Sequence, residues 1–197
     1  MGASVTEAEA ATRPLRADAK RNRELLLAAA RTAFTERGAD ASLEDIARRA
    51  GVGVGTLYRH FANRQQLIEA VYVEEVEALC RSAEDFAGEP PWDALVHWFD
   101  RFVEYVTTKR ALLDEMMATI GHDAPVFRSC HDAILTAGGP LLAQAKEAGV
   151  IRPEVEFVDA IRLVSGITMI KNCPPEEVRR ALAFALDGLR YGAPSGT

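Results

Sequence analysis

Apolar residues recur three and four positions apart along most of the chain, which is the spacing of one buried face on an α-helix. Strict alternation of Val, Ile and Thr with polar residues, the pattern of a half-buried strand, is missing. Ala, Leu, Glu and Arg, which favour helices, are abundant instead. The pattern therefore predicts an all-α protein with about nine helices and no sheet.

The first apolar stripe of helical spacing runs from Leu26 to Phe34. Polar residues precede it, and a glycine follows it. We expect residues 1–15 to form a disordered tail, because they are rich in Ala, Thr and Glu and include a proline. Asp18 is a plausible N-cap for the first helix, and Gly38 ends it.

Three further helices are predicted before residue 90. Ser42, followed by two acids, is placed to cap a short helix. The Gly51-Val52-Gly53 sequence breaks that helix, and a second short helix follows over residues 54–61. Asn63 then caps a long fourth helix, whose apolar stripe fades near Gly88.

Prolines and glycines divide the rest of the chain. A proline suits the first turn of a helix, and a glycine suits its end. The predicted helical segments span about residues 91–106, 110–120, 125–148, 155–170 and 175–191. Gly138-Gly139-Pro140 is expected to bend or interrupt the third of these.

Charge is unevenly distributed along the 197 residues, whose formal net charge is -6. Between Arg13 and Arg64 there are eleven Lys or Arg residues and six acids, whereas acids outnumber bases in the remainder. A basic head on an acidic body lets one end of the molecule attract phosphate. No apolar stretch reaches the roughly 20 residues that span a bilayer, and no signal peptide is evident, so a cytoplasmic protein is expected.

The segment from Ser42 to Arg64 has the pattern of a helix-turn-helix, in which two short helices meet at a glycine turn. A small residue, Ala47, lies where the helices would cross. Val52 and Leu57 would face inward and hold the second helix against its neighbours. The exposed positions of the second helix are then Val54, Gly55, Thr56, Tyr58, Arg59 and His60.

The exposed side chains suit the major groove of DNA. Arg59 can reach guanine O6 and N7, the commonest specific contact, and Thr56 can contact a phosphate or a thymine methyl. Tyr58 and His60 can donate to phosphate oxygens. Gly55 removes side-chain bulk, so that the start of the helix can approach the duplex.

These residues resemble the DNA-binding domain of TetR/AcrR-type regulators over about residues 20–72. The matching motifs are Asp45-Ile46-Ala47, Ala50-Gly51-Val52, Gly55-Thr56-Leu57-Tyr58-Arg59-His60-Phe61 and Arg64. The resemblance implies that Ser42 and Tyr58 contact phosphate. It also implies that Val54, Thr56, Arg59 and His60 face the groove, and that Arg64 replaces the family's usual lysine. Gly53-Val54 departs from the more frequent polar pair, so fewer side chains are expected to read bases.

The resemblance further implies a homodimer that binds a palindromic operator on double-stranded DNA and is released by a small molecule. The expected organisation is a tail at 1–15, a DNA-binding domain at 16–64, and a helical effector-binding and dimerisation domain at 65–192. The effector would be a small apolar or amphipathic molecule, with no cofactor and no membrane partner. A regulator without an effector, or an activator, is the alternative.

Aromatic residues and methionines in the second half of the chain suit an adaptable apolar pocket, with histidines to orient a ligand. Each of them singly also suits a plain helical core. The candidate ligand contacts are Trp98, Phe102, Tyr105, Met116, Met117, His122, Phe127 and His131.

The last two predicted helices carry apolar and small residues at helical spacing, which suits a four-helix interface between two subunits. Packing within one chain is the alternative reading of the same pattern. The candidate interface residues are Val158, Ile161, Ser165, Thr168, Leu182, Ala185, Leu186 and Leu189.

Catalytic and metal sites are not expected. His122-Asp123 and His131-Asp132 with Cys130 do not have ligand spacing on one helical face. The three cysteines are far apart, and neither a Gly-rich phosphate loop nor a GxSxG elbow occurs. The sequence therefore indicates a binding protein rather than an enzyme.

Overall fold

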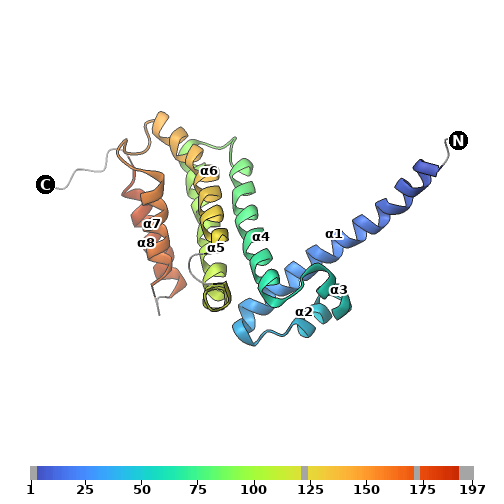
Figure 1. The fold of residues 1–197 in the computed structure, drawn as a ribbon. Coiled ribbons are helices and arrows are strands. Elements are labelled where there is room, and N and C mark those ends of the chain that lie inside the picture. Colours follow the sequence, from blue (N-terminus) through green and yellow to red (C-terminus); the bar gives the residue numbers. More distant parts are fainter. Residues whose placement is uncertain (1–3, 121–123, 171–173, 191–197) are drawn as a thin grey trace. The chain divides into compact units, whose positions relative to one another are not determined.

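The computed structural model describes residues 4–120, 124–170 and 174–190, and in these ranges it is all-helical (Figure 1). The helices are α1 (Ser4–Arg37), the 3-10 turn η1 (Gly38–Asp40), α2 (Leu43–Arg49), α3 (Val54–His60), α4 (Arg64–Asp85), α5 (Pro91–Ile120), α6 (Pro125–Glu147), α7 (Phe157–Thr168) and α8 (Pro175–Asp187). The described ranges contain no strand, only an isolated bridge between Ile151 and Arg190. The all-α prediction is confirmed.

The chain divides into two compact units that do not follow one another in sequence. The first unit contains residues 1–72 and 111–122, and the second contains residues 73–110 and 123–197. The division falls within α4, eight residues beyond the predicted boundary after Arg64, and again within α5. Helix α4 therefore contributes its first turns to one unit and its later turns to the other.

Two helix boundaries differ from the sequence prediction. Helix α1 begins at Ser4 rather than near Asp18, so residues 4–15, expected to be a disordered tail, are helical. Alanine and glutamate have high helix propensity, and they outweigh the proline in this stretch. Helix α5 runs unbroken where two segments were predicted, because no glycine or proline follows Pro91 before Ile120.

The turn between α2 and α3 forms as predicted. Ser42 caps α2, since its Oγ accepts the backbone N–H of Asp45 at 3.1 Å. Gly51 has a φ of 70°, a conformation that side-chain-bearing residues rarely adopt. The Val52 N–H bonds the Ala47 carbonyl at 3.0 Å, and the Gly51 N–H bonds Arg48 at 3.1 Å. These two bonds make a Schellman motif, which stops α2 and turns the chain into α3.

The core of the first unit joins α1, α2 and α3, which Figure 1 shows together. Helix α1 contributes the predicted stripe from Leu26 to Phe34, and α2 contributes Ile46 and Ala47. Leu57 is the only residue of α3 that is fully buried. Helix α3 has just seven residues, so packing rather than its own stability holds it in place.

The core of the second unit is built on an aromatic cluster. The Trp98 ring stacks on Phe102 at 5.8 Å and contacts Phe157 at 5.5 Å, between ring centroids. A Cβ atom at Gly138 would lie 2.3 Å from Phe157 Cζ, so only glycine allows α6 to come this close. Helix α6 passes through Gly138-Gly139-Pro140 without interruption. Here the glycine provides close packing rather than a break in the helix.

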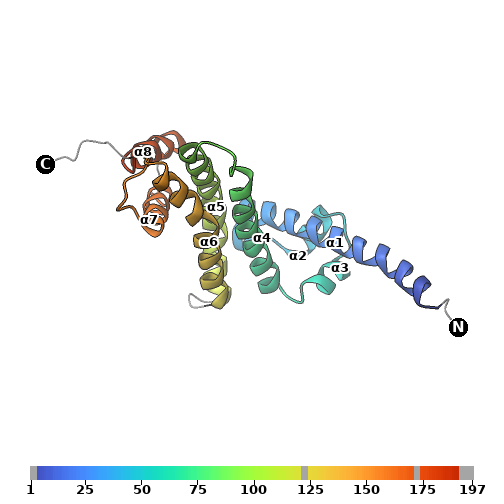
Figure 2. The same ribbon diagram turned by 90° about the horizontal axis from the view of Figure 1, so that it is seen from above.

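Helices α7 and α8 lie side by side in the second unit, as Figures 1 and 2 both show. Val164 and Ala160 of α7 are buried, as is Leu182 of α8. None of the helices in the described ranges is long and apolar enough to cross a membrane.

Candidate nucleic-acid interface

Helix α3 buries one side of itself and presents the other to solvent. Leu57 is 0% exposed, whereas Val54 is 42% and Tyr58 47% exposed. Arg59 and Gly55 are also exposed, and Thr56 and His60 are half-buried. The structure thus brings the residues predicted from α3 to one open surface. The exposed tyrosine and valine on this surface do not belong to the hydrophobic core.

Arg59 is held along its own helix. Its Nε donates to the Gly55 carbonyl at 3.2 Å, and its Nη2 donates to Thr56 Oγ1 at 2.9 Å. The carbonyl and the hydroxyl are both neutral, so the charge of the guanidinium remains available to an anion or to the acceptors of a guanine. Thr56 therefore orients the arginine that was predicted to read bases.

Helix α1 borders this surface, which the sequence analysis did not predict. A hollow of about 290 Å³ is lined by Asp18, Ala19 and Asn22 of α1 together with Thr56, Arg59 and His60 of α3. Asn22 can donate and accept hydrogen bonds. No local motif marks α1 as a neighbour of α3, because the contact joins residues more than thirty positions apart.

Ser42 caps the start of α2 and is also exposed. The side chain is exposed, and its oxygen already accepts the Asp45 N–H. A hydroxyl that accepts in this way still has a proton to donate. Ser42 can therefore cap α2 and bond a phosphate oxygen at the same time, in line with the phosphate contact that the resemblance implies.

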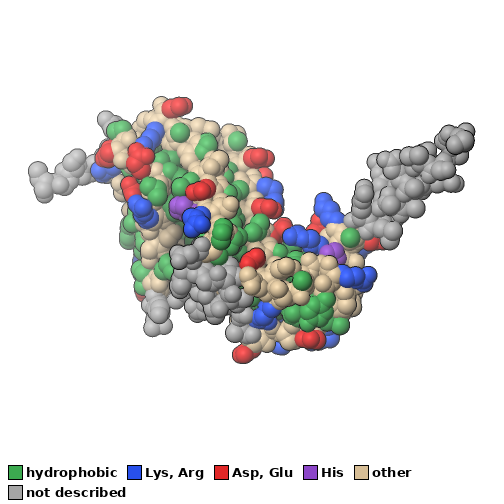
Figure 3. Space-filling view, in the orientation of Figure 1, with side chains coloured by type: hydrophobic (Ala, Val, Ile, Leu, Met, Phe, Trp, Pro, Cys, Tyr) green, Lys and Arg blue, Asp and Glu red, His purple; other side chains and the backbone are tan. Residues whose placement is uncertain are grey.

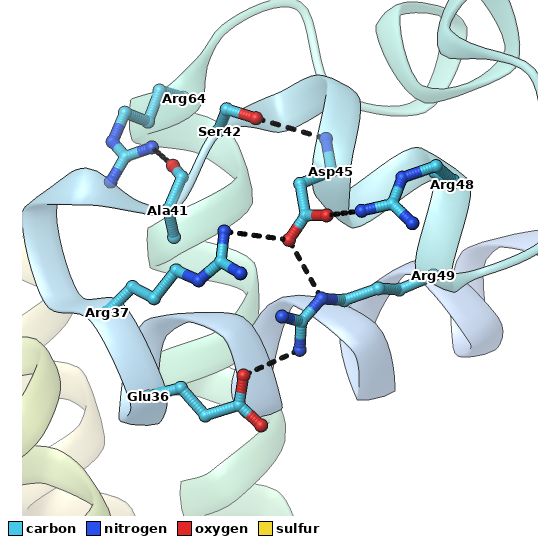
Figure 4. Close-up of polar contacts among 8 residues, drawn as sticks. All are labelled: Glu36, Arg37, Ala41, Ser42, Asp45, Arg48, Arg49 and Arg64. Atoms are coloured by element: carbon cyan, nitrogen blue, oxygen red, sulfur yellow. Dashed lines mark hydrogen bonds and ion pairs between the residues drawn. The ribbon is translucent and has the colours of Figure 1, made fainter.

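Arg64, predicted to contact DNA, makes contacts within the first unit. Its guanidinium turns back to the segment that precedes α2 and donates to the carbonyl of Ala41 (Figure 4). It also donates to the carbonyl of Gly38 at 3.4 Å. Its Cζ lies 5.1 Å from the centre of the Phe34 ring. The side chain is half-buried. Its partners are protein groups, which the predicted contact with DNA did not take into account.

A cluster of charges, which we call the Asp45 cluster, fastens α2 to the end of α1. Asp45 is only 8% exposed, accepts hydrogen bonds from Arg48 and from Arg49 at 2.8 Å, and forms an ion pair with Arg37 at 3.5 Å (Figure 4). Burial of the carboxyl opposes its ionisation. The hydrogen bond from Arg49 and the charges of the three arginines outweigh this effect, so the pKa of Asp45 is lowered.

The Asp45 cluster also reaches α1 through Arg49, which bonds Glu36 at 2.7 Å. Hydrogen bonds to Glu36 and Asp45 outweigh burial and raise the pKa of Arg49. In the orientation of Figure 1, acidic side chains lie among the basic ones of the first unit (Figure 3). That face is therefore mixed in charge rather than uniformly basic.

The predicted ligand contacts are mostly core. Trp98, Phe102, Tyr105 and Met116 are buried, whereas Phe127 is half-buried and His131 exposed. His122 and the side chain of Met117 lie outside the described residues. The buried indole N–H of Trp98 has no hydrogen-bond acceptor among the described residues.

A groove of about 580 Å³ opens elsewhere in the second unit, between α4 and α6. Small and apolar residues line most of it, and burial raises the pKa of the Cys80 thiol, which therefore stays neutral. Sequence reasoning missed this groove because alanines do not stand out as ligand contacts. Its walls are Cys80, Arg81, Ala83 and Glu84 of α4, Ala87 just after α4, and Ala133, Thr136, Ala137, Pro140, Leu141 and Gln144 of α6.

The predicted interface residues fall into two groups according to their burial. Ile161, Leu182 and Leu186 are buried within the chain itself, so for these three the alternative reading, packing within one chain, applies. The other five, Val158, Ser165, Thr168, Ala185 and Leu189, are half-buried. Large apolar residues that the prediction omitted are exposed instead: Phe184 by 71%, Ile170 and Met169 by 49%, and Leu163 by 40%.

Comparison with known proteins agrees with the helix-turn-helix geometry. Residues 26–71 match the model of the bacterial regulatory proteins of the tetR family, and residues 90–191 match the C-terminal domain of SbtR-like transcriptional regulators. The second match alone spans just over half of the chain. UidR, an HTH-type transcriptional regulator of Escherichia coli K12, is 28% identical over 190 residues, which cover 89% of this chain and 93% of UidR.

Two solved structures are similar along most of their length. A TetR transcriptional regulator from Streptomyces coelicolor is 40% identical with a TM-score of 0.77, and the match covers 87% of this chain and 99% of that one. A TetR regulatory protein from Mycobacterium vanbaalenii is 33% identical with a TM-score of 0.74, covering 90% and 99%. The chain belongs to the TetR family of DNA-binding transcriptional regulators, which are not enzymes.

Proposed function

We propose that this regulator is a cytoplasmic homodimeric repressor that binds a palindromic operator and leaves it when a small apolar or amphipathic effector binds. The observation that carries the proposal is the exposed surface of α3, where Arg59 is oriented by Thr56 beside the exposed ring of Tyr58. A guanidinium held in this way suits recognition of guanine, and the phenol suits a phosphate oxygen.

Dimerisation follows from the size of the recognition element. A helix of seven residues covers too little of the groove for specific binding by itself. Two copies on one face of the duplex, about 34–36 Å apart, would double the contacts and require a palindrome. The exposed Phe184, with Leu163 on the neighbouring helix, provides apolar surface of the kind that a subunit interface covers.

The groove between α4 and α6 supports the effector part of the proposal. Its volume of about 580 Å³ is within the range of small-molecule sites, which are mostly apolar with a few polar groups. Thr136 and Gln144 are the neutral polar groups there, and Arg81 is the cation. Helix α4 continues from this groove into the first unit, so a ligand that displaces α4 also acts on the DNA-binding residues.

The proposal is tested by selecting fragments of genomic DNA that the full-length protein binds and by mapping protection on them. We expect two inverted half-sites about one helical turn apart, and a dimer by light scattering. Apolar compounds that raise the melting temperature are then added to the complex, and at least one should release the DNA. A single unrepeated site with a monomeric protein would refute the dimer, and DNA binding that no stabilising compound reverses would refute the effector.

A further inference from the structure

Arg64 stands at a junction of three segments in the first unit. It is the first residue of α4, and it lies over the Phe34 ring of α1. It also donates to carbonyls of the connection that leads into α2, and Figure 4 shows the bond to Ala41. The residues it bonds in this connection are 23 and 26 positions earlier in the chain. A single side chain thus links helices that are distant in sequence.

The carbonyls that Arg64 binds belong to a helix end. Helix α1 stops at Arg37, Gly38 has a φ of 52°, and the backbone is extended at Ala41. Carbonyls at a helix end lie beyond the regular bonds of the helix, and the Gly38 carbonyl also accepts the Ala41 N–H at 3.3 Å. The planar guanidinium carries five N–H donors in a fixed fork, so one arginine can serve two carbonyls, whereas the ammonium of lysine is a compact point charge.

The bond to Ala41 reaches the DNA-binding surface through one residue. Ala41 is 1% exposed and directly precedes Ser42, whose hydroxyl caps α2. The carbonyl of Ala41 belongs to the peptide group that ends in the Ser42 nitrogen. Fixing this peptide plane fixes the position from which the Ser42 hydroxyl faces solvent.

We propose that Arg64 is a positioning residue, which holds Ser42 and the first turn of α2 in register with α4, and is not itself a phosphate ligand. Two of its bonds are to the neutral carbonyls of Ala41 and Gly38, which the fork of a guanidinium can reach together. Because Arg64 begins α4, a shift of that turn is passed to Ser42 through the Ala41 peptide. The inference concerns DNA binding and holds whether or not an effector exists.

Two substitutions at Arg64 separate the effect of the forked N–H donors of the guanidinium from the effect of its charge. Arg64→Lys keeps the charge and loses the paired donors, and Arg64→Gln loses the charge while keeping a short amide donor. We expect Arg64→Lys to weaken binding about tenfold, the scale of one charge-assisted hydrogen bond. Arg64→Gln should leave the slope of log K against log salt unchanged, since a lost phosphate contact would lower that slope by about 0.9. Arg31→Lys, an exposed arginine of α1, is the matched control and should bind like wild type.

The path through Ser42 is tested by a double-mutant cycle with Ser42→Ala on the full-length protein. The probe is a duplex that the wild-type protein enriches from a random-sequence pool, and all measurements are made well below each variant's melting temperature. If Arg64 acts by positioning Ser42, Ser42→Ala weakens the wild type but has little further effect on Arg64→Lys. Additive losses would overturn the inference and leave Arg64 with a general effect on stability. Wild-type affinity for Arg64→Lys, with a reduced salt slope for Arg64→Gln, would overturn it in favour of a phosphate contact.

Discussion

Replacing Gly138 by alanine tests how tightly α6 is packed against the aromatic cluster of the second unit. The added carbon would lie 2.3 Å from Phe157 Cζ and 2.7 Å from Trp98 Cη2. Carbon atoms in favourable contact are about 3.5–4.0 Å apart, so both rings must move by about an ångström. Trp98 is fully buried and Phe157 is only 9% exposed, so both rings can move only against packed neighbours.

The magnitude follows from two opposing effects. Overpacking of this kind destabilises a core by about 1–3 kcal/mol. Alanine is also a better helix former than glycine, by about 1 kcal/mol at an interior position. The neighbouring Gly139 isolates the second effect, because a Cβ there meets nothing within 4 Å. Gly139→Ala should therefore stabilise the protein, and Gly138→Ala should be less stable than Gly139→Ala by about 1–3 kcal/mol.

Thermal unfolding of the two full-length variants measures this difference directly. For a chain of this length, 1 kcal/mol corresponds to about 2–4 °C, so Gly138→Ala should melt about 2–12 °C below Gly139→Ala. Because the propensity gain is common to both variants, it cancels in the comparison. Equal melting temperatures, or a higher value for Gly138→Ala, would show that α6 does not approach the two rings as closely as the structure indicates.

Three further predictions concern DNA, pH and assembly. Arg59→Ala should lose about 1–3 kcal/mol of discrimination between bases, whereas Tyr58→Phe should weaken binding to all duplexes alike. Competition between the selected operator and unrelated DNA measures both effects. Equal losses of affinity for the two DNAs in Arg59→Ala would rule out base reading. Because the pKa of Asp45 is lowered in the fold, the stability it provides is present above its unfolded pKa of about 3.9 and is lost as pH falls through the folded value. Wild type should therefore unfold at higher urea than Asp45→Asn at neutral pH, and the gap should close only below about pH 4; a constant gap would contradict the ionic role. If the proposed dimer forms through this surface, Phe184→Lys should yield a monomer by light scattering without loss of helical circular dichroism, and a persistent dimer would place the interface elsewhere.

The helix-turn-helix could be predicted because its signals are local. The cap at Ser42, the left-handed turn at Gly51 and the inward Leu57 lie within sixteen residues of one another, and each fixes the backbone at its own position. The exposed residues of α3 are then determined by the helical repeat. The same reasoning placed Pro91 and Pro125 at the starts of α5 and α6.

The features that the sequence did not predict depend on distant contacts. Arg64 was expected at DNA because of its neighbours in sequence, but its partners Gly38 and Ala41 lie far upstream. Periodicity identified apolar faces on α7 and α8 without telling which of their residues pack inside the chain. Leu182 is buried there, whereas Phe184, two positions later and on the opposite side of the helix, is exposed.

The arrangement around Arg59 bears on how this regulator obtains its specificity. In the free protein the guanidinium bonds Gly55 and Thr56, which both lie on its own helix. When the guanidinium binds a guanine, it gives up these neutral partners for the neutral acceptors of the base. Such an exchange releases no ion pair, and its net gain is the one bidentate contact, about 1–3 kcal/mol. Specific binding exceeds non-specific binding by about 4–10 kcal/mol in DNA-binding proteins generally. One arginine in each of two half-sites covers only part of that range. We therefore expect the remainder to come from the deformability of the operator between the half-sites, at base pairs that no side chain contacts.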